Sequence, residues 1–153
     1  MRKALFIDRD GTINRDRGYT YKVSDLELYP DSIELIKRHN GEGYVVIVIT
    51  NQAGIGKGIF TEEECMLFNN ALITEMKHND ARIDYVYYCP HRPEDDCRCR
   101  KPNAGLVRMA AKDLDINLKE SVVVGDRDEI EGELARRLSM DYMIIDRNAA
   151  TED

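Results

Sequence analysis

Short apolar runs alternate with longer segments of helical pattern along this chain. The run Tyr44–Ile49 is apolar on both faces, as expected of a strand that helices cover on both sides. Four further runs have the same character: Ala4–Ile7, Ile83–Tyr88, Ser121–Val124 and Tyr142–Ile145. Between the runs, the pattern predicts helices at Asp31–Asn40, Thr61–His78, Ala104–Leu114 and Glu129–Leu138.

The alternation of strands and helices predicts the fold class. Strands that alternate with helices indicate right-handed crossovers and a mostly parallel sheet. Thr61 and Glu64 are spaced as in a capping box, which supports a helix start there. We therefore expect a Rossmann-like, three-layer α/β/α sandwich around a mostly parallel five-stranded sheet. Residues 1–153 contain no repeat or evident linker, so a single domain is predicted.

Two stretches break the alternation. Residues 14–29 are polar and rich in Tyr and Asp, and residues 89–102 contain three cysteines, one histidine and three prolines. Both follow a predicted strand. Because ligands bind beyond the carboxyl ends of the strands in an open parallel sheet, we expect the functional site at that edge.

Composition and charge narrow the function classes. The net charge of −7 disfavours a general nucleic-acid binder, which needs a basic surface, but it does not exclude a small anionic substrate. No apolar run approaches the roughly 18 residues of a membrane span, and the first run is too short for a secretory signal. We expect a cytoplasmic protein without a membrane partner, in which the four cysteines stay reduced.

The first candidate cluster is Asp8-Arg9-Asp10-Gly11-Thr12, directly after the first predicted strand. Two carboxylates at this spacing can face one crevice, where one attacks an electrophile, the other transfers a proton, and a cation relieves their repulsion. An isolated Asp-x-Asp would more often be an acidic turn that caps a helix. The apolar strand before it and the Gly-Thr after it favour the catalytic interpretation.

Three weaker clusters also follow predicted strands. Thr50-Asn51-Gln52 can bind phosphoryl oxygens, Arg100-Lys101-Pro102 supplies cations, and Gly125-Asp126-Arg127 offers a ligand for Mg²⁺. Taken singly, each could instead be a turn, a helix cap or a solvated basic pair.

A third set of residues has the chemistry of a zinc site. Cys89, His91, Cys97 and Cys99 offer three thiolates and one imidazole within eleven positions. Such a closed Cys₃His set suits structural Zn²⁺, which would tie down the irregular loop that runs into Arg100. Cys65 stands apart in a helical pattern and is interpreted as a packing residue.

Apart from the cysteine set, the chain thus has four clusters after predicted strands: the one that begins at Asp8 and the three weaker ones. In this order along nearly the whole chain, they resemble the motifs of the haloacid dehalogenase superfamily of phosphatases. The resemblance implies that Asp8 is the nucleophile and that Asp10 acts first as general acid and then as general base. It also implies that Thr50 and Lys101 bind the transferring phosphoryl group. Mg²⁺ would be held by Asp8, the backbone carbonyl of Asp10, and Asp126.

The cysteine loop resembles the branch of heptose bisphosphate phosphatases and histidinol-phosphate phosphatases, which lack a large cap domain. This branch implies substrate contacts from Asn51 and Arg100. The segments around Asp8, Tyr19 and Thr50 favour the sugar-bisphosphate enzymes, so the expected partner is a small phosphorylated metabolite, bound by a monomer. A histidinol-phosphate phosphatase and a zinc-stabilised binding protein without turnover are the alternatives. Where the family usually places an aspartate after Gly-Asp, this chain has Ile130 and then Glu131, which is the candidate for that role.

Overall fold

The sheet is the centre of the molecule. The structure is a computed structural model that describes residues 1–150 of the 153-residue chain. Its five strands lie in the order β3-β2-β1-β4-β5, and all four pairings between neighbours are parallel. The strands are β1 (Ala4–Ile7), β2 (Val45–Asn51), β3 (Tyr85–Cys89), β4 (Val122–Gly125) and β5 (Asp141–Ile144). The predicted five-stranded sheet is confirmed, with strand ends displaced by at most two residues.

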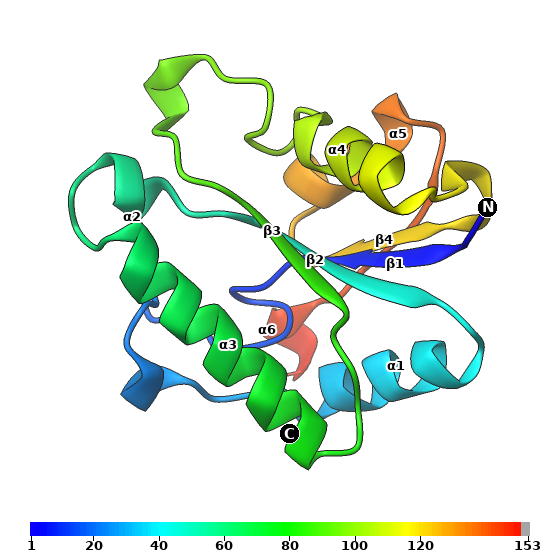
Figure 1. Cartoon of the computed structure of the whole chain (residues 1–153), viewed down its shortest axis with the longest axis horizontal. Helices are drawn as coiled ribbons and strands as arrows, with labels where there is room; N and C mark the ends of the chain where they lie inside the picture. Colours follow the sequence, from blue (N-terminus) through cyan, green and yellow to red (C-terminus); the bar gives the residue numbers. More distant parts are fainter. Residues whose placement is uncertain (151–153) are drawn as a thin grey trace.

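Helices cover both faces of this sheet (Figure 1). They are α1 (Pro30–Gly41), α2 (Ala53–Gly56), α3 (Glu62–His78), α4 (Gly105–Leu114), α5 (Glu133–Arg137) and α6 (Arg147–Ala150). Buried side chains of α4 and α5 pack on one face, and those of α1 and α3 pack on the other. The predicted three-layer sandwich is therefore confirmed, and no large cap domain is inserted within residues 1–150.

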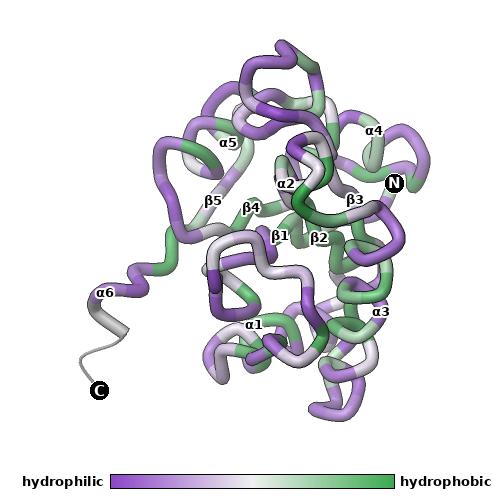
Figure 2. The backbone as a smooth tube through the Cα atoms, turned by 90° about the vertical axis from the view of Figure 1, so that its left-hand side faces the viewer, coloured by the Kyte–Doolittle hydropathy of each residue, from purple (hydrophilic) through white to green (hydrophobic). Residues whose placement is uncertain are grey.

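Alternate residues of β1 enter the two halves of the core. Ala4 and Phe6 belong to the cluster under α4 and α5, whereas Leu5 and Ile7 belong to the cluster over α1 and α3. This follows from the two-residue period of a strand. Because both faces are covered, every residue of β1 is apolar and fully buried, and the hydrophobic strands lie inside a largely polar exterior (Figure 2).

Helix starts and lengths follow local sequence only in part. The capping box at the start of α3 is confirmed: Thr61 Oγ1 accepts from the Glu64 amide at 3.1 Å, and the Thr61 amide donates to Glu64 Oε1 at 2.9 Å. Helices α2 and α6 were not predicted, because four residues are too few to show a 3.6-residue period. Within residues 1–150, no helix has the length and apolar character needed to span a bilayer.

The prediction of one regular helix over Glu129–Leu138 is wrong. Residues Asp128–Gly132 form a π-helical turn, and α5 is a short α-helix that follows it. The wide turn carries the Glu131 side chain into the interior against Gly125, where a Cβ atom would lie 2.2 Å from Glu131 Cγ. Such turns recur at functional sites because they redirect a side chain that a regular helix would place elsewhere.

Candidate active site

A pocket of about 370 Å³ opens at the carboxyl ends of the central strands. It is lined by every predicted catalytic and substrate residue and by the predicted aspartate ligands: Asp8, Asp10, Thr50, Asn51, Arg100, Lys101 and Asp126. A larger hollow of about 620 Å³ lies beside α3, but Glu75 is its one ionisable lining residue in the described part of the chain. The smaller pocket, and not the larger hollow, therefore has the convergent charged side chains that a catalytic site requires.

Lys101 forms the buried ionic centre of this pocket. Its Nζ donates to Asp8 Oδ1 at 2.7 Å, to Glu131 Oε2 at 2.9 Å and to the Ile49 carbonyl at 2.7 Å. These three bonds use all three ammonium hydrogens. Burial alone would lower the Lys101 pKa, but the Asp8 and Glu131 carboxylates outweigh it and raise the pKa. The lysine is thus held in its charged form beside the proposed nucleophile.

Asn51 positions the backbone that carries this lysine. Its Oδ1 accepts from the Lys101 amide at 2.9 Å, and its Nδ2 donates to the Lys101 carbonyl at 3.1 Å. The end of β2 is thereby tied to the loop after β3. Asn51 lines the pocket as predicted, but both ends of its amide already bind backbone, which gives it a second role that the sequence did not indicate.

Three carboxylates converge beside Lys101. One oxygen each of Asp8, Asp126 and Glu131 lies within 4.8 Å of the others, and Thr12 Oγ1 is 3.1 Å from Asp8 Oδ2 and 3.2 Å from Asp126 Oδ1. Burial, followed by the charge of Asp8, raises the Asp126 pKa to about 6. Burial also raises the Glu131 pKa to about 7, against the opposing effect of Lys101.

This donor set fits a hard divalent cation. Mg²⁺ prefers oxygen ligands, and a divalent ion would relieve the mutual repulsion that one lysine leaves among three carboxylates. A glycine at position 11 lets the backbone come close to the Asp126 carboxylate. A Cβ atom on Gly11, whose φ is +86°, would lie 2.5 Å from Asp126 Oδ2. The predicted ligands Asp8 and Asp126 are brought together, and Asp10 lies in the same pocket.

Arg147 holds the loop that follows the proposed nucleophile. From α6 it donates to the carbonyls of Gly11, at 3.0 Å, and Thr12, and its Nη1 donates to both carboxylate oxygens of Asp31 at 2.9 Å. The Thr12 hydroxyl is the one that lies between Asp8 and Asp126. A contact across 136 positions in the chain has no local signal, so the sequence by itself does not indicate it.

The four predicted zinc ligands form one cluster at the end of β3. Cys97 Sγ lies 3.6 Å from Cys89 Sγ and 3.7 Å from Cys99 Sγ, while the Cys89 and Cys99 sulfurs are 2.6 Å apart. His91 Nδ1 is 3.4 Å from Cys89 Sγ and 3.2 Å from Cys99 Sγ. A tetrahedral ion with Zn–S bonds of about 2.3 Å separates its sulfurs by roughly 3.7 Å, so the two Cys97 distances suit zinc.

The three thiols of the cluster differ in their pKa: burial raises the pKa of Cys89 and Cys99, whereas the pKa of Cys97 is lowered. Burial alone would raise the Cys97 pKa, but hydrogen bonds with the Arg100 backbone, Cys89 and Cys99 lower the Cys97 pKa to about 7. A thiol that ionises readily is a better metal ligand. Cys65 is buried on α3, outside this cluster, as its packing interpretation requires.

Three further cations line the pocket, of which Arg127 is already paired with a carboxylate. Arg100 Nη1 is buried and has no hydrogen-bond partner within residues 1–150. Lys57 Nζ donates to Tyr19 Oη at 2.8 Å, which joins the loop after β2 to the segment 14–29 at the pocket rim. An unpaired buried guanidinium nitrogen is costly, so Arg100 Nη1 is available to an anion that enters the pocket.

Comparisons with known proteins agree with this architecture. Residues 3–152 match the family model of polynucleotide kinase 3 phosphatase. A probable D-glycero-D-manno-heptose-1,7-bisphosphate 7-phosphatase of Thermoplasma volcanium is 46% identical over 143 residues, which cover 94% of this chain and 98% of the relative. The chain belongs to the haloacid dehalogenase-like heptose 1,7-bisphosphate phosphatase family.

Two other members of this family extend the comparison. The D-glycero-beta-D-manno-heptose-1,7-bisphosphate 7-phosphatase of Haemophilus influenzae is 32% identical over 151 residues, with 94% of this chain and 82% of the relative covered. The crystal structure of the D,D-heptose 1.7-bisphosphate phosphatase of B. bronchiseptica, complexed with magnesium and phosphate, superposes with a TM-score of 0.86 at 25% identity. That match covers 99% of this chain and 87% of the other. The family resemblance stated from the motifs is confirmed.

Proposed function

We propose that this chain is a Mg²⁺-dependent phosphatase that hydrolyses a phosphate monoester of a small sugar bisphosphate, of the D-glycero-D-manno-heptose 1,7-bisphosphate type. The observation that carries the proposal is the convergence of Asp8, Lys101 and Asp126 in one pocket at the strand ends. The names of the family relatives support the substrate class, and a structural neighbour complexed with magnesium and phosphate supports the chemistry.

The reaction has two displacements at phosphorus. In the first, an Asp8 carboxylate oxygen bonds to phosphorus as the ester P–O bond breaks, and protonated Asp10 gives its proton to the leaving alcohol oxygen. In the second, Asp10 takes a proton from a water molecule that attacks the aspartyl phosphate. Inorganic phosphate leaves, and Asp8 and protonated Asp10 are both restored.

Charge neutralisation supplies the rest of the catalysis. Lys101 is held beside Asp8, where it offsets charge on the transferring oxygens, and the Thr50 hydroxyl lines the same pocket. Bound Mg²⁺, held by Asp8, Asp126 and the Asp10 carbonyl, would lower the repulsion between the carboxylate and the phosphoryl group. Glu131 Oε2 also accepts from Lys101 Nζ and helps to keep the lysine in place.

A screen of the purified protein against phosphorylated metabolites tests the proposal. Mg²⁺-dependent release of phosphate from an aryl phosphate would distinguish an enzyme from a binding protein that lacks turnover. Among natural substrates, we expect the heptose bisphosphate to have the highest kcat/KM. A clear preference for histidinol phosphate would replace the sugar-bisphosphate proposal with that alternative.

Arg100→Ala tests how a second phosphate is recognised. The buried, unpaired Arg100 Nη1 can bind a non-reacting phosphate, and a lost charge-assisted bond costs about 1.5–3 kcal/mol. We expect kcat/KM to fall roughly 10- to 100-fold for a sugar bisphosphate and much less for a small aryl phosphate. Arg98→Ala, which removes an exposed charge that does not line the described pocket, is the matched control. Equal losses on both substrates would instead place Arg100 on the transferring phosphoryl group.

Zinc content tests the role of the cysteine cluster. We propose that structural Zn²⁺ binds Cys89, His91, Cys97 and Cys99, at about one ion per chain. The double variant Cys97→Ser/Cys99→Ser should lose the zinc and melt at a lower temperature, because the loop before Lys101 is no longer held. Cys65→Ser is the matched control and should retain the zinc. Unchanged zinc in the double variant, measured by elemental analysis, would refute this ligand set.

A further inference from the structure

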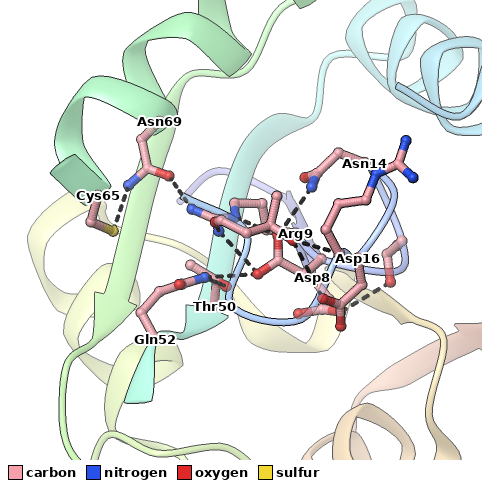
Figure 3. Close-up of polar contacts among 12 residues, drawn as sticks. Asp8, Arg9, Asn14, Asp16, Thr50, Gln52, Cys65 and Asn69 are labelled. Atoms are coloured by element: carbon pink, nitrogen blue, oxygen red, sulfur yellow. Dashed lines mark hydrogen bonds and ion pairs between the residues drawn. The ribbon is translucent and has the colours of Figure 1, made fainter. Parts of the chain in front are cut away.

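Arg9 lies between the two catalytic aspartates in sequence but points into the protein. Its side chain is fully buried, with the guanidinium carbon 4.4 Å from the centre of the Phe68 ring. Nη1 donates to Asn69 Oδ1 of α3 at 2.9 Å, and Nη2 donates to the Thr20 carbonyl at 2.6 Å. Figure 3 shows the Asn69 amide between Arg9 and Cys65, in contact with both.

The same guanidinium group grips the Asp10 carboxylate with two parallel bonds. Arg9 Nε donates to Asp10 Oδ1 at 2.9 Å, and Arg9 Nη2 donates to Asp10 Oδ2 at 3.0 Å. With the bonds to Asn69 and Thr20, four of its five N–H groups are used. A planar fork with this many fixed partners sets the orientation of a carboxylate more strictly than a lysine could.

The other donors to Asp10 differ in their access to the pocket. Asn14 Nδ2 donates to Oδ1 at 3.0 Å, and Gln52 Nε2 donates to Oδ2 at 3.1 Å. Both carboxylate oxygens therefore accept two bonds each, which fills their acceptor positions. Arg9 and Asn14 are fully buried, and of these three donor residues Gln52 alone lines the pocket in the described part of the chain.

We propose that Arg9 is a positioning residue that aims Asp10 at the leaving-group oxygen of the substrate, an inference that rests on the proposed function. The buried Arg9 and Asn14 contacts fix the carboxylate plane. The Gln52 amide, which also donates to Thr50 Oγ1 at 2.8 Å, is the contact that a leaving oxygen can replace. Arg9 acts through Asp10 and does not itself touch the substrate.

The bond to Thr20 braces the guanidinium group from the segment 14–29. Thr20 follows Tyr19, which lines the pocket with a left-handed backbone at φ 52°. Thr20 Oγ1 in turn accepts from the Arg17 amide at 2.7 Å. The Thr20 carbonyl thus helps to fix the guanidinium group that orients Asp10.

Dependence on the leaving group tests this inference. A sugar phosphate needs a proton on its leaving alkoxide, whereas the leaving group of dinitrophenyl phosphate departs as a stable anion. A misdirected general acid should therefore lower kcat/KM for the sugar phosphate by about 100-fold and leave that for dinitrophenyl phosphate nearly unchanged. The variants are Arg9→Lys, which keeps the charge but loses the fork, and Asn69→Ala, which removes the brace from α3. The second should act in the same direction but more weakly.

A double variant provides the control. Because Arg9 acts through Asp10, Arg9→Lys/Asp10→Asn should hydrolyse the sugar phosphate no more slowly than Asp10→Asn alone. Equal losses on the two substrates in Arg9→Lys and Asn69→Ala would overturn the inference and reduce Arg9 to a structural role, as would additive losses in the double variant. If Arg9→Lys does not fold, the substrate comparison in Asn69→Ala decides. A wild-type protein that hydrolyses neither substrate would refute the proposed function itself.

Discussion

Asp8→Asn is expected to lower kcat by at least about ten-thousandfold, because an amide cannot attack phosphorus as the carboxylate does. The substitution keeps the shape of the side chain. Its carbonyl oxygen can still accept from Lys101, whose second carboxylate partner, Glu131, remains in place. The folded structure should therefore persist while turnover is lost.

Two measurements accompany this variant. Acid-quenched wild-type enzyme should show phosphate bound to Asp8 by mass spectrometry during turnover, and the variant should show none. Asp113→Asn, which alters a surface carboxylate bonded to Tyr87, should keep normal kcat. Near-normal turnover in Asp8→Asn would rule out the covalent mechanism.

The second large effect is expected from Lys101→Met. This change removes the positive charge between Asp8 and Glu131 and leaves two carboxylates facing each other in the interior. Removing one partner of a buried ion pair typically costs about 3–5 kcal/mol of unfolding free energy. Turnover should fall with it, since the charge that neutralises the transferring oxygens is also gone.

A compensating variant separates the two effects of this change. Lys101→Met/Glu131→Gln should recover part of the lost unfolding free energy, because one of the stranded charges is removed, but it should not recover turnover. Lys112→Met, on the exposed face of α4, is the matched control and should alter the unfolding free energy by no more than about 0.5 kcal/mol. Chemical denaturation measures the unfolding free energy of the single variant, the double variant and the control. If Lys101→Met were as stable as the wild-type protein, this ionic cluster would not stabilise the fold.

The sequence determined the strands, the order of the motifs and the composition of the cysteine cluster. Apolar runs such as Tyr44–Ile49 give strands directly, because residues buried on both faces must all be apolar. The carboxyl ends of parallel strands share one edge, so polar clusters after β1, β2 and β4 had to meet there. Cys89 and Cys99 are near neighbours in sequence, which makes a metal cluster readable from spacing alone.

Only the tertiary structure decided how the site is braced. Lys101 meets Asp8 across 93 positions and Glu131 across 30, and Arg147 reaches Gly11 across 136. Glu131 enters the pocket through a π-helical turn that the helical period of its segment does not indicate. The sequence places Arg9 in a charged segment, which does not indicate burial, yet its side chain is fully buried. The physical reason is common to all of them: a buried charge is stable only when its partners surround it in space, and those partners come from elements that no local pattern connects.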